Sequence, residues 1–249
     1  MQSRRTLTKM GFASLITLVG SRATSIAAQT PETFTMDEME FEYQGMLAVS
    51  NLPELPTAPD GECAVILQRT GDDSSILAIF HNASEETVHI NRVSGTATNE
   101  QGHTDTSVQG QSLHAPRTLD PGDYGIAVLE FPERRQTYTD ELIELEVVPK
   151  SELDPAMVTM PVTEVHLVNP RSGNSMNMQV QNRSQETLEE DSSGFVGTFF
   201  GPDGEPAYWF VSTFRTDTEP GEERWISHAS TSMVLTDSFM IGFSGQVLE

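Results

Sequence analysis

The sequence predicts an all-β protein folded as two tandem β-sandwich domains behind an N-terminal leader. A short motif occurs twice, about 100 residues apart. Apolar stretches of strand length alternate with turns rich in Gly, Pro and Asn, and no segment has the pattern of a strand–helix–strand unit. The chain has 249 residues, of which 37% are hydrophobic. Each half is therefore large enough to bury a core of its own.

The repeated motif has the form Asn-x-Ser-x-Glu-Thr and begins at Asn82 in the first copy and at Asn182 in the second. The same ordered signals follow in both copies: Gly95-Thr96, Gly102 and Pro121-Gly122 in the first, and Gly197-Thr198, Gly204 and Pro220-Gly221 in the second. Because these signals keep their order, we expect a duplicated domain. The repeats would cover 62–148 and 162–249, with a linker over 149–161.

Each repeat is expected to start with two antiparallel strands. The first strand covers 63–68 in one repeat and 162–168 in the other, and the second covers 76–81 and 176–181. Residues 176–181 alternate apolar and polar side chains, as in a strand with one buried face. Residues 76–81 are apolar on both faces, which predicts a more central or more covered strand.

The remaining strands follow in the same order in both repeats. The Asn-x-Ser motif favours a turn held by side-chain hydrogen bonds, and each Pro-Gly pair predicts a type II turn with glycine at positive φ. Residues 28–61 form an acidic, Pro-containing segment that could add an edge strand over 40–49. We expect further strands at 88–98, 124–131 and 143–147, and at 195–200, 224–229 and 239–243.

This order of motifs resembles the FxLYD-type domain, a small immunoglobulin-like module of exported prokaryotic proteins. The second repeat is the more similar, because residues 197–204 occupy the place of the aromatic signature and Glu219-Pro220-Gly221-Glu222 follows. The Leu-Tyr-Asp part is absent, and the first repeat has Ala97-Thr98-Asn99 where aromatic residues are expected. The resemblance implies two tandem immunoglobulin-like β-sandwich domains, an envelope or extracellular accessory role, and no known catalytic residues.

Residues 1–27 are expected to be a twin-arginine signal peptide. Arg4 and Arg5 lie in a Ser-Arg-Arg-Thr-Leu-Thr-Lys segment that resembles the export motif, although Leu and Thr replace its Phe and Leu. The apolar stretch 10–20 is too short to span a bilayer, and small residues precede a cleavage site after Ala27 or Ala28. An uncleaved membrane anchor is the alternative. The signal predicts a prokaryotic protein exported to the envelope or medium, with no membrane span in its mature form.

Acidic residues dominate the composition, with 37 Asp and Glu against 14 Lys and Arg and a net charge of −23. Four basic residues and no acidic ones lie in the leader, so the mature part keeps 10 basic residues and a net charge of −27. Such a charge repels nucleic acid and anionic lipid. It also destabilises the fold at low salt, which suggests a salty exterior, with ordinary surface acidity as the alternative.

Few residues offer catalytic or metal chemistry. No nucleophile elbow, phosphate-binding loop or His-Glu-x-x-His pattern occurs. His81 and His89 flank the turn after a strand and could bind a metal ion together with Asp72 or Asp73, but a surface pair without metal is the simpler interpretation. Cys63, the single cysteine, lies in an apolar strand and is expected to be a core thiol.

The densest aromatic group consists of Tyr208, Trp209 and Phe210, with Trp225 further along the chain. In an alternating strand Trp209 faces opposite to Tyr208 and Phe210, so one face could be exposed and contact a sugar or a partner protein. Burial in the core is the simpler interpretation.

Together these features predict a non-enzymatic exported protein that acts through protein or envelope contacts and needs no cofactor. A periplasmic or extracellular binding module for a metal ion or a carbohydrate is the second interpretation, and an unrecognised hydrolase is the third. The functional prediction rests on analogy at the level of the fold.

Overall fold

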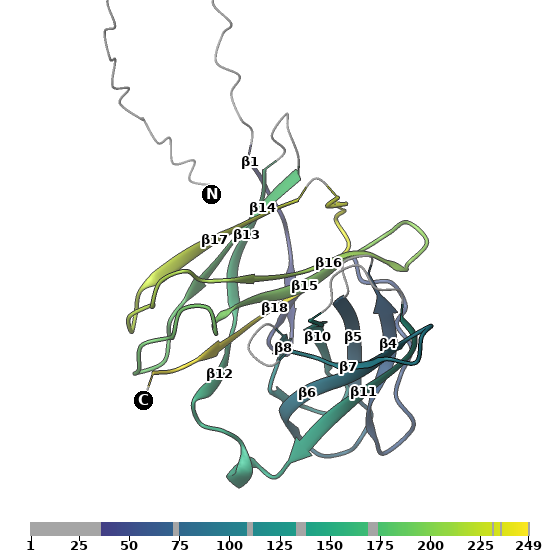
Figure 1. Cartoon of the computed structure of the whole chain (residues 1–249). Coiled ribbons are helices and arrows are strands. Elements are labelled where there is room, and N and C mark those ends of the chain that lie inside the picture. Colours follow the sequence, from purple (N-terminus) through teal and green to yellow (C-terminus); the bar gives the residue numbers. More distant parts are fainter. Residues whose placement is uncertain are drawn as a thin grey trace, which may run out of the picture. The chain divides into compact units, whose positions relative to one another are not determined.

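The described part of the protein consists of β-strands and one short 3-10 helix, η1 (Lys150–Glu152), which confirms the expected all-β class (Figure 1). The structure is a computed structural model, and it describes residues 36–71, 75–108, 112–132, 138–168, 174–230, 232–234 and 236–248. Arg4, Arg5, Asp72, Asp73 and the cleavage site at Ala27 and Ala28 lie outside these ranges. Within the ranges, no helix is long and apolar enough to cross a bilayer.

The first two of four antiparallel sheets are built from residues 63–148. The first outer sheet runs β11 (Tyr138–Val148), β6 (Val88–Asn99) and β7 (Thr104–Thr106), and β9 (Thr118–Leu119) also pairs with β6. The first inner sheet runs β4 (Cys63–Thr70), β5 (Ser75–Asn82), β10 (Tyr124–Glu130) and β8 (Leu113–Ala115).

The other two sheets combine residues 157–246 with the segment before the first repeat. The second inner sheet runs β16 (Pro206–Thr213), β15 (Gly194–Phe200), β18 (Phe239–Gln246), β3 (Leu47–Ser50) and β2 (Glu42–Gln44), and β12 (Met157–Met160) also pairs with β18. The second outer sheet runs β1 (Met36–Glu38), β13 (Val162–Val168), β14 (Asn174–Gln181) and β17 (Glu223–Ser230).

Three apolar cores lie between the four sheets and define the order of the layers. The first core, between the first outer and first inner sheets, contains Phe80 and Leu129. The middle core lies between the two inner sheets and contains Leu77 and Phe200. The third core contains Phe195 and joins the second inner sheet to the second outer sheet. The described sheets therefore stack in the order first outer, first inner, second inner and second outer, and we call the first pair of sheets the first sandwich and the second pair the second sandwich.

The two inner sheets approach closely at one point, and a glycine permits it. A Cβ atom added to Gly242 of β18 would lie 2.5 Å from the Cβ atom of Ala115 in β8 and 2.8 Å from Leu47. Both distances are shorter than van der Waals contact. A side chain at position 242 would therefore push the two sandwiches apart.

The burial of each strand follows its layer. In β5, which belongs to an inner sheet, every residue is buried. In β14, which belongs to an outer sheet, buried residues alternate with partly exposed ones over the six residues 175–180. The sequence pattern of 76–81, apolar on both faces, thus corresponds to a strand covered by a sheet on each side.

The two Asn-x-Ser motifs form turns with the same hydrogen bonds. Asn82 Nδ2 donates to the carbonyl oxygens of Glu86 (2.9 Å) and Leu119 (3.1 Å), while Asn82 Oδ1 accepts from the backbone N–H (3.1 Å) and hydroxyl (2.7 Å) of Ser84. Asn182 makes the corresponding four bonds, at 2.9, 2.9, 3.0 and 2.7 Å. Its partners are Glu186, Thr218 and Ser184.

A Pro-Gly turn closes each of these corners. Gly122 N donates to Asn82 O at 2.8 Å, and Gly221 N donates to Asn182 O at the same distance. The two glycines have φ of 87° and 78°, the conformation that the Pro-Gly pairs predict. Side chains other than glycine rarely adopt this φ, so both corners depend on glycine.

The segments outside the two repeats add strands to the second sandwich. β1 pairs with β13 at the edge of the second outer sheet. The β2–β3 hairpin covers residues 42–50, where one edge strand was expected over 40–49, and only β2 lies at the edge. β3 then pairs with β18. The expected linker 149–161 contains η1 and β12, and β12 also pairs with β18.

Candidate functional site

A groove of 990 Å³ lies along β6, at the open side of the first sandwich. It is lined by residues 91–96 of β6 and by His114 of the edge strand β8. Met157 from the linker and Ser192 and Gln246 from the second sandwich also line it. Both sandwiches and the connection between them therefore contribute to this site, which we call the β6 groove.

The β6 groove exists because the strand next to β6 is short. β7 pairs with β6 only at residues 96–98. The chain makes a last contact at Ser107, whose N–H donates to Gly95 O (2.9 Å) and whose hydroxyl accepts from Gly95 N (3.0 Å). The next residue, Val108, already donates to Glu130 O at the end of β10 (2.7 Å). The edge of β6 beyond Gly95 is left without a neighbouring described strand until β9 pairs at 88–89.

The backbone of Val93 faces this open edge. Gly95 directs its N–H and C=O toward Ser107, and alternate residues of a strand direct these groups to the same side. Because β6 and β11 pair without a bulge between Arg92 and Thr98, the N–H and C=O of Val93 point to the same side of β6 as those of Gly95. No described residue hydrogen-bonds to the backbone of Val93 on that side. Val93 is buried, and buried backbone groups are rarely left without a partner.

His114 adds a second polar atom without a partner in the same groove. The side chain is 8% exposed, and its Nε2 atom has no hydrogen-bond partner among the described residues. Burial, helped by the nearby Arg117 cation, lowers the pKa of His114 to about 4, although a hydrogen bond to the Ile90 backbone acts in the opposite direction. The ring is therefore neutral at pH 7. Because a carbonyl acceptor requires Nδ1–H, Nε2 carries the lone pair and can accept a hydrogen bond.

Arg117 fixes the end of the β6 groove nearest the linker. Its side chain is buried, and Nη1 donates to the carbonyl oxygens of Asp154 (2.7 Å) and Met157 (2.9 Å). Nη2 donates to O (3.3 Å) and Oδ1 (3.1 Å) of Asn91, and Nε donates to Ile90 O (3.3 Å). All five N–H groups thus have acceptors. Burial lowers the pKa of Arg117, while the carboxylate of Asp154 raises it.

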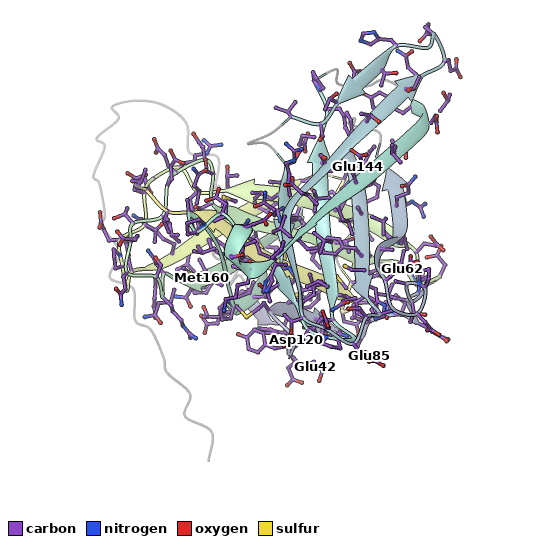
Figure 2. All side chains as sticks on the ribbon, turned by 90° about the horizontal axis from the view of Figure 1, so that it is seen from below. Glu42, Glu62, Glu85, Asp120, Glu144 and Met160 are labelled. Carbon is purple, nitrogen blue, oxygen red and sulfur yellow. The ribbon has the colours of Figure 1, made fainter. Side chains whose placement is uncertain are left out.

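The outer face beside the groove carries two carboxylates with different partners. Glu146 accepts from Asn91 Nδ2 (3.1 Å) and lies 3.5 Å from Arg92 Nε. Glu144, labelled on β11 in Figure 2, has no ion-pair partner among the described residues. Glu144 pairs across the strands with Ser94. A cationic group next to Ser94 would therefore meet an uncompensated carboxylate.

The two histidines expected to approach each other lie on different sheets. His81 is buried in β5, where Nδ1 accepts from Ala58 N (3.1 Å) and the ring lies 4.6 Å from Tyr124. His89 is in β6 and contacts Thr118 Oγ1 at 3.0 Å. Among the described residues, no group of three or more His, Cys, Asp or Glu could hold a metal ion.

The aromatic segment of β16 is divided between two cores. Tyr208 and Phe210 face the third core, where Tyr208 OH lies 2.7 Å from Nε2 of His228, and Phe210 is buried. Burial lowers the pKa of His228. Trp209 faces the opposite way, packs against the middle core and donates from Nε1 to Ser75 Oγ (2.8 Å). These rings thus serve to join the sheets.

Trp225 differs from the other predicted aromatic residues because 47% of its surface is exposed. It lies on β17, and its ring is 5.0 Å from that of His166. Cys63, in contrast, packs against the first core, and burial raises the pKa of its thiol to about 11. A protonated thiol is a poor nucleophile.

No protein-family model matches the chain, and no curated protein matches it. Solved structures of oxalate decarboxylase from Bacillus subtilis align over 84% of this chain and 78% of theirs. A structure at pH 4.6 has 10% identity and a TM-score of 0.19, and two mutants have 10% identity and TM-scores of 0.19 and 0.21. At these scores the likeness carries no conclusion about fold or activity.

Proposed function

We propose that the protein is an exported, non-enzymatic accessory protein that acts by binding another protein at the β6 groove. In this proposal its two sandwiches are tandem immunoglobulin-like domains derived from one duplicated unit. The matching corners at Asn82 and Asn182 and the resemblance to FxLYD-type domains support the duplication. The twin-arginine pattern supports export to the envelope or medium.

The observation that carries the proposal is the combination of two unpartnered polar groups in one groove. Val93 and His114 both line the groove, and the backbone of Val93 on this side and the buried Nε2 atom of His114 both lack described partners. Polar groups of this kind are costly when buried alone and are satisfied when a ligand supplies hydrogen bonds. The net charge of −27 after cleavage argues for a protein ligand rather than nucleic acid.

The proposal is tested in the native host by site-specific photocrosslinking. A benzophenone amino acid is placed at Thr106, an exposed residue that lines the groove, or at Ala229, an exposed residue on β17. We expect discrete crosslinked species from Thr106 and none from Ala229. Crosslinks from Ala229 alone, or none from either site, would contradict binding at the groove.

Export is tested separately with a double substitution in the leader. Arg4→Lys combined with Arg5→Lys should leave the protein inside the cell, because the paired arginines define the export pattern. Fractionation of the culture, with detection of the protein in each fraction, measures this. Unchanged recovery outside the cell would remove the twin-arginine part of the proposal.

One observation favours a carbohydrate-binding module as the second candidate function. The exposed ring of Trp225 lies on a face that also carries His166 and the hydrogen-bonded pair Gln179 and Glu223, whose atoms Nε2 and Oε2 are 3.1 Å apart. Aromatic rings beside polar side chains suit sugars. Trp225→Ala should abolish binding to an oligosaccharide array if this function is correct. Leu142→Ala, at an exposed residue of the first outer sheet, is the matched control.

A further inference from the structure

The second sandwich shows what occupies a strand edge like that of the β6 groove. Residues 194–199 of β15 all pair with the neighbouring strand β16, and Phe195 lies opposite Ser212. The Gly95-Thr96 pair of β6 matches the Gly197-Thr198 pair of β15. Val93, two residues before Gly95, therefore corresponds to Phe195, two residues before Gly197. In the first sandwich this place has no described strand beside it. The open position therefore corresponds to a strand in the second sandwich.

The groove can accept a short extended peptide. The open edge covers residues 92–94, because the carbonyl oxygen of Asn91 already accepts from Arg117, and three residues of a strand extend about 10 Å. A peptide pairing with Val93 would supply one N–H and one C=O, which are the hydrogen-bond partners that the Val93 backbone lacks. Because β7 is antiparallel to β6, a peptide that continues the line of β7 would be antiparallel as well.

The direction of the side chains determines which residue the peptide places inside. Residues opposite each other in an antiparallel pair direct their side chains to the same face. Val93 directs its side chain into the first core, so the peptide residue opposite Val93 also points inward. His114 lines the same groove, and its ring is hydrogen-bonded to the backbone of Ile90, three residues before Val93.

A small residue with a hydroxyl group suits this inward position. Nε2 of His114 is buried and can only accept a hydrogen bond while the ring is neutral, so a ligand group that reaches this atom must donate one. In the second sandwich the equivalent position opposite Phe195 is held by Ser212. Serine and threonine meet both requirements, since each is small and has an O–H donor.

The outward positions favour a positive charge on one side. The peptide residue opposite Ser94 would lie next to the cross-strand pair of Ser94 and Glu144. Glu144 has no ion-pair partner among the described residues, whereas Glu146 already pairs with Arg92. A Lys or Arg opposite Ser94 would therefore gain an ion pair, and one opposite Arg92 would be repelled.

We propose that an extended segment of the partner protein adds to β6 as an antiparallel strand at Val93, with a Ser or Thr directed toward His114 and a basic residue beside Glu144. This inference rests on the proposed function and adds the binding mode and the sequence preference of the partner. Strand addition of this kind obtains affinity from the backbone and specificity from alternate side chains.

The test uses the complete exported protein, labelled with ¹⁵N, and a synthetic library of nonapeptides with one position fixed at a time. We expect pools with Ser or Thr at one position and Lys or Arg at an adjacent position to bind best. The best peptide should slow hydrogen exchange of the Val93 amide at least about tenfold and leave the amide of Ser227 unchanged. If no pool protects Val93, the groove holds water only and the inference is wrong.

Two measurements separate strand addition from other modes of binding. N-methylation of the peptide residue opposite Val93 should abolish binding, whereas N-methylation of either neighbour, whose N–H points away from β6, should have little effect. His114→Asn keeps a donor toward Ile90 but removes the Nε2 acceptor. This variant should bind the peptide with Ser at the inward position about tenfold more weakly than the wild-type protein does. Its affinity for the same peptide with Ala at that position should be unchanged.

The outcomes distinguish this inference from the proposed function. If crosslinks form at Thr106 but N-methylation shows no alternation, the protein binds a partner at the groove by another mode and strand addition is wrong. If the peptides behave as expected but Thr106 gives no crosslink in the host, the groove accepts strands and the accessory role is wrong. The N-methylation series needs no protein variant, so a folding defect in His114→Asn would leave the result intact.

Discussion

The two repeats use opposite sheets to form the junction between the sandwiches. In the first repeat, the sheet containing β5 lies inside and the sheet containing β6 lies outside. In the second repeat, the sheet containing β14 lies outside and the sheet containing β15 lies inside. Strands that hold the same place in the two repeats therefore lie in different layers. A property that the two strands share follows from their place in the repeat, and a property in which they differ follows from the layer.

Residue by residue, the difference is confined to one face of each strand. Ile76 and Phe80 face the core of the first sandwich, as Met176 and Val180 face that of the second. The intervening residue Leu77 faces the junction and is buried. Its counterpart, Asn177, is partly exposed on the outer face. On one face of these strands the residues are apolar because they line the core of their own sandwich. On the other face the residue type depends on whether a second sandwich covers that face.

The strongest test of this comparison is truncation at the matched positions 77 and 177. Leu77→Ala should lower the free energy of unfolding by about 2–5 kcal/mol, because it leaves a cavity in the middle core. Asn177→Ala should change it by less than about 0.5 kcal/mol, because the site is at the surface. Chemical denaturation monitored by circular dichroism measures both. Equal losses at the two positions would mean that the inner sheets are not packed together.

Acid should reveal a difference between His114 and His228, the two histidines whose pKa is lowered by burial. Burial lowers the pKa of His114 from 6.5 to about 4. As pH falls below 6.5, the unfolded chain takes up a proton that the folded chain does not, so this residue makes the protein less stable. The loss reaches about 3 kcal/mol by pH 4. Burial also lowers the pKa of His228, but its ring is hydrogen-bonded to Tyr208, so we expect a smaller loss there.

The measurement is the difference in stability between the wild-type protein and each variant across pH 4 to 7. Comparing variants cancels contributions from other groups, such as Asp123, whose pKa is raised by burial and which acts in the opposite direction. His114→Asn should remove most of the loss at acid pH, and His228→Asn should remove less. A pH profile that His114→Asn leaves unchanged would contradict the buried, neutral state of this ring.

The sequence predicted the strands and corners better than the groove. The apolar pattern of 76–81 indicated a covered strand, because hydrophobic periodicity records burial directly. The pattern could not show which surface covers it, since that depends on contacts between distant segments. The groove arises where the strand beside β6 is short. The sequence contained a signal for it, because residues 104–107 are polar, whereas Tyr208 to Val211 are apolar. β8, which carries His114, is only three residues long and has no periodicity to detect.

The corners provide the case in which the two repeats should respond alike. Asn82 and Asn182 are both buried and make the same four side-chain hydrogen bonds. Asn82→Ala and Asn182→Ala should each cost about 2 kcal/mol, because each removes four side-chain hydrogen bonds, one of them to the buried carbonyl of Leu119 or Thr218. Denaturation of the two variants measures this. A difference of more than about 1 kcal/mol would mean that the layers influence the corners as well.

Salt should affect the outer layers and leave the junction unchanged. The exposed face of β11 carries Glu144 and Glu146, whereas β5 has no acidic residue. Salt screens repulsion between exposed charges, since the Debye length falls from about 10 Å at 0.1 M to about 3 Å at 1 M. We expect the Tm to rise by about 3 °C over this range, equivalent to about 1 kcal/mol. The loss caused by Leu77→Ala should be the same at both salt concentrations. A Tm that does not rise would remove adaptation to a salty exterior, and a salt-dependent loss at Leu77 would mean that the junction is open to solvent.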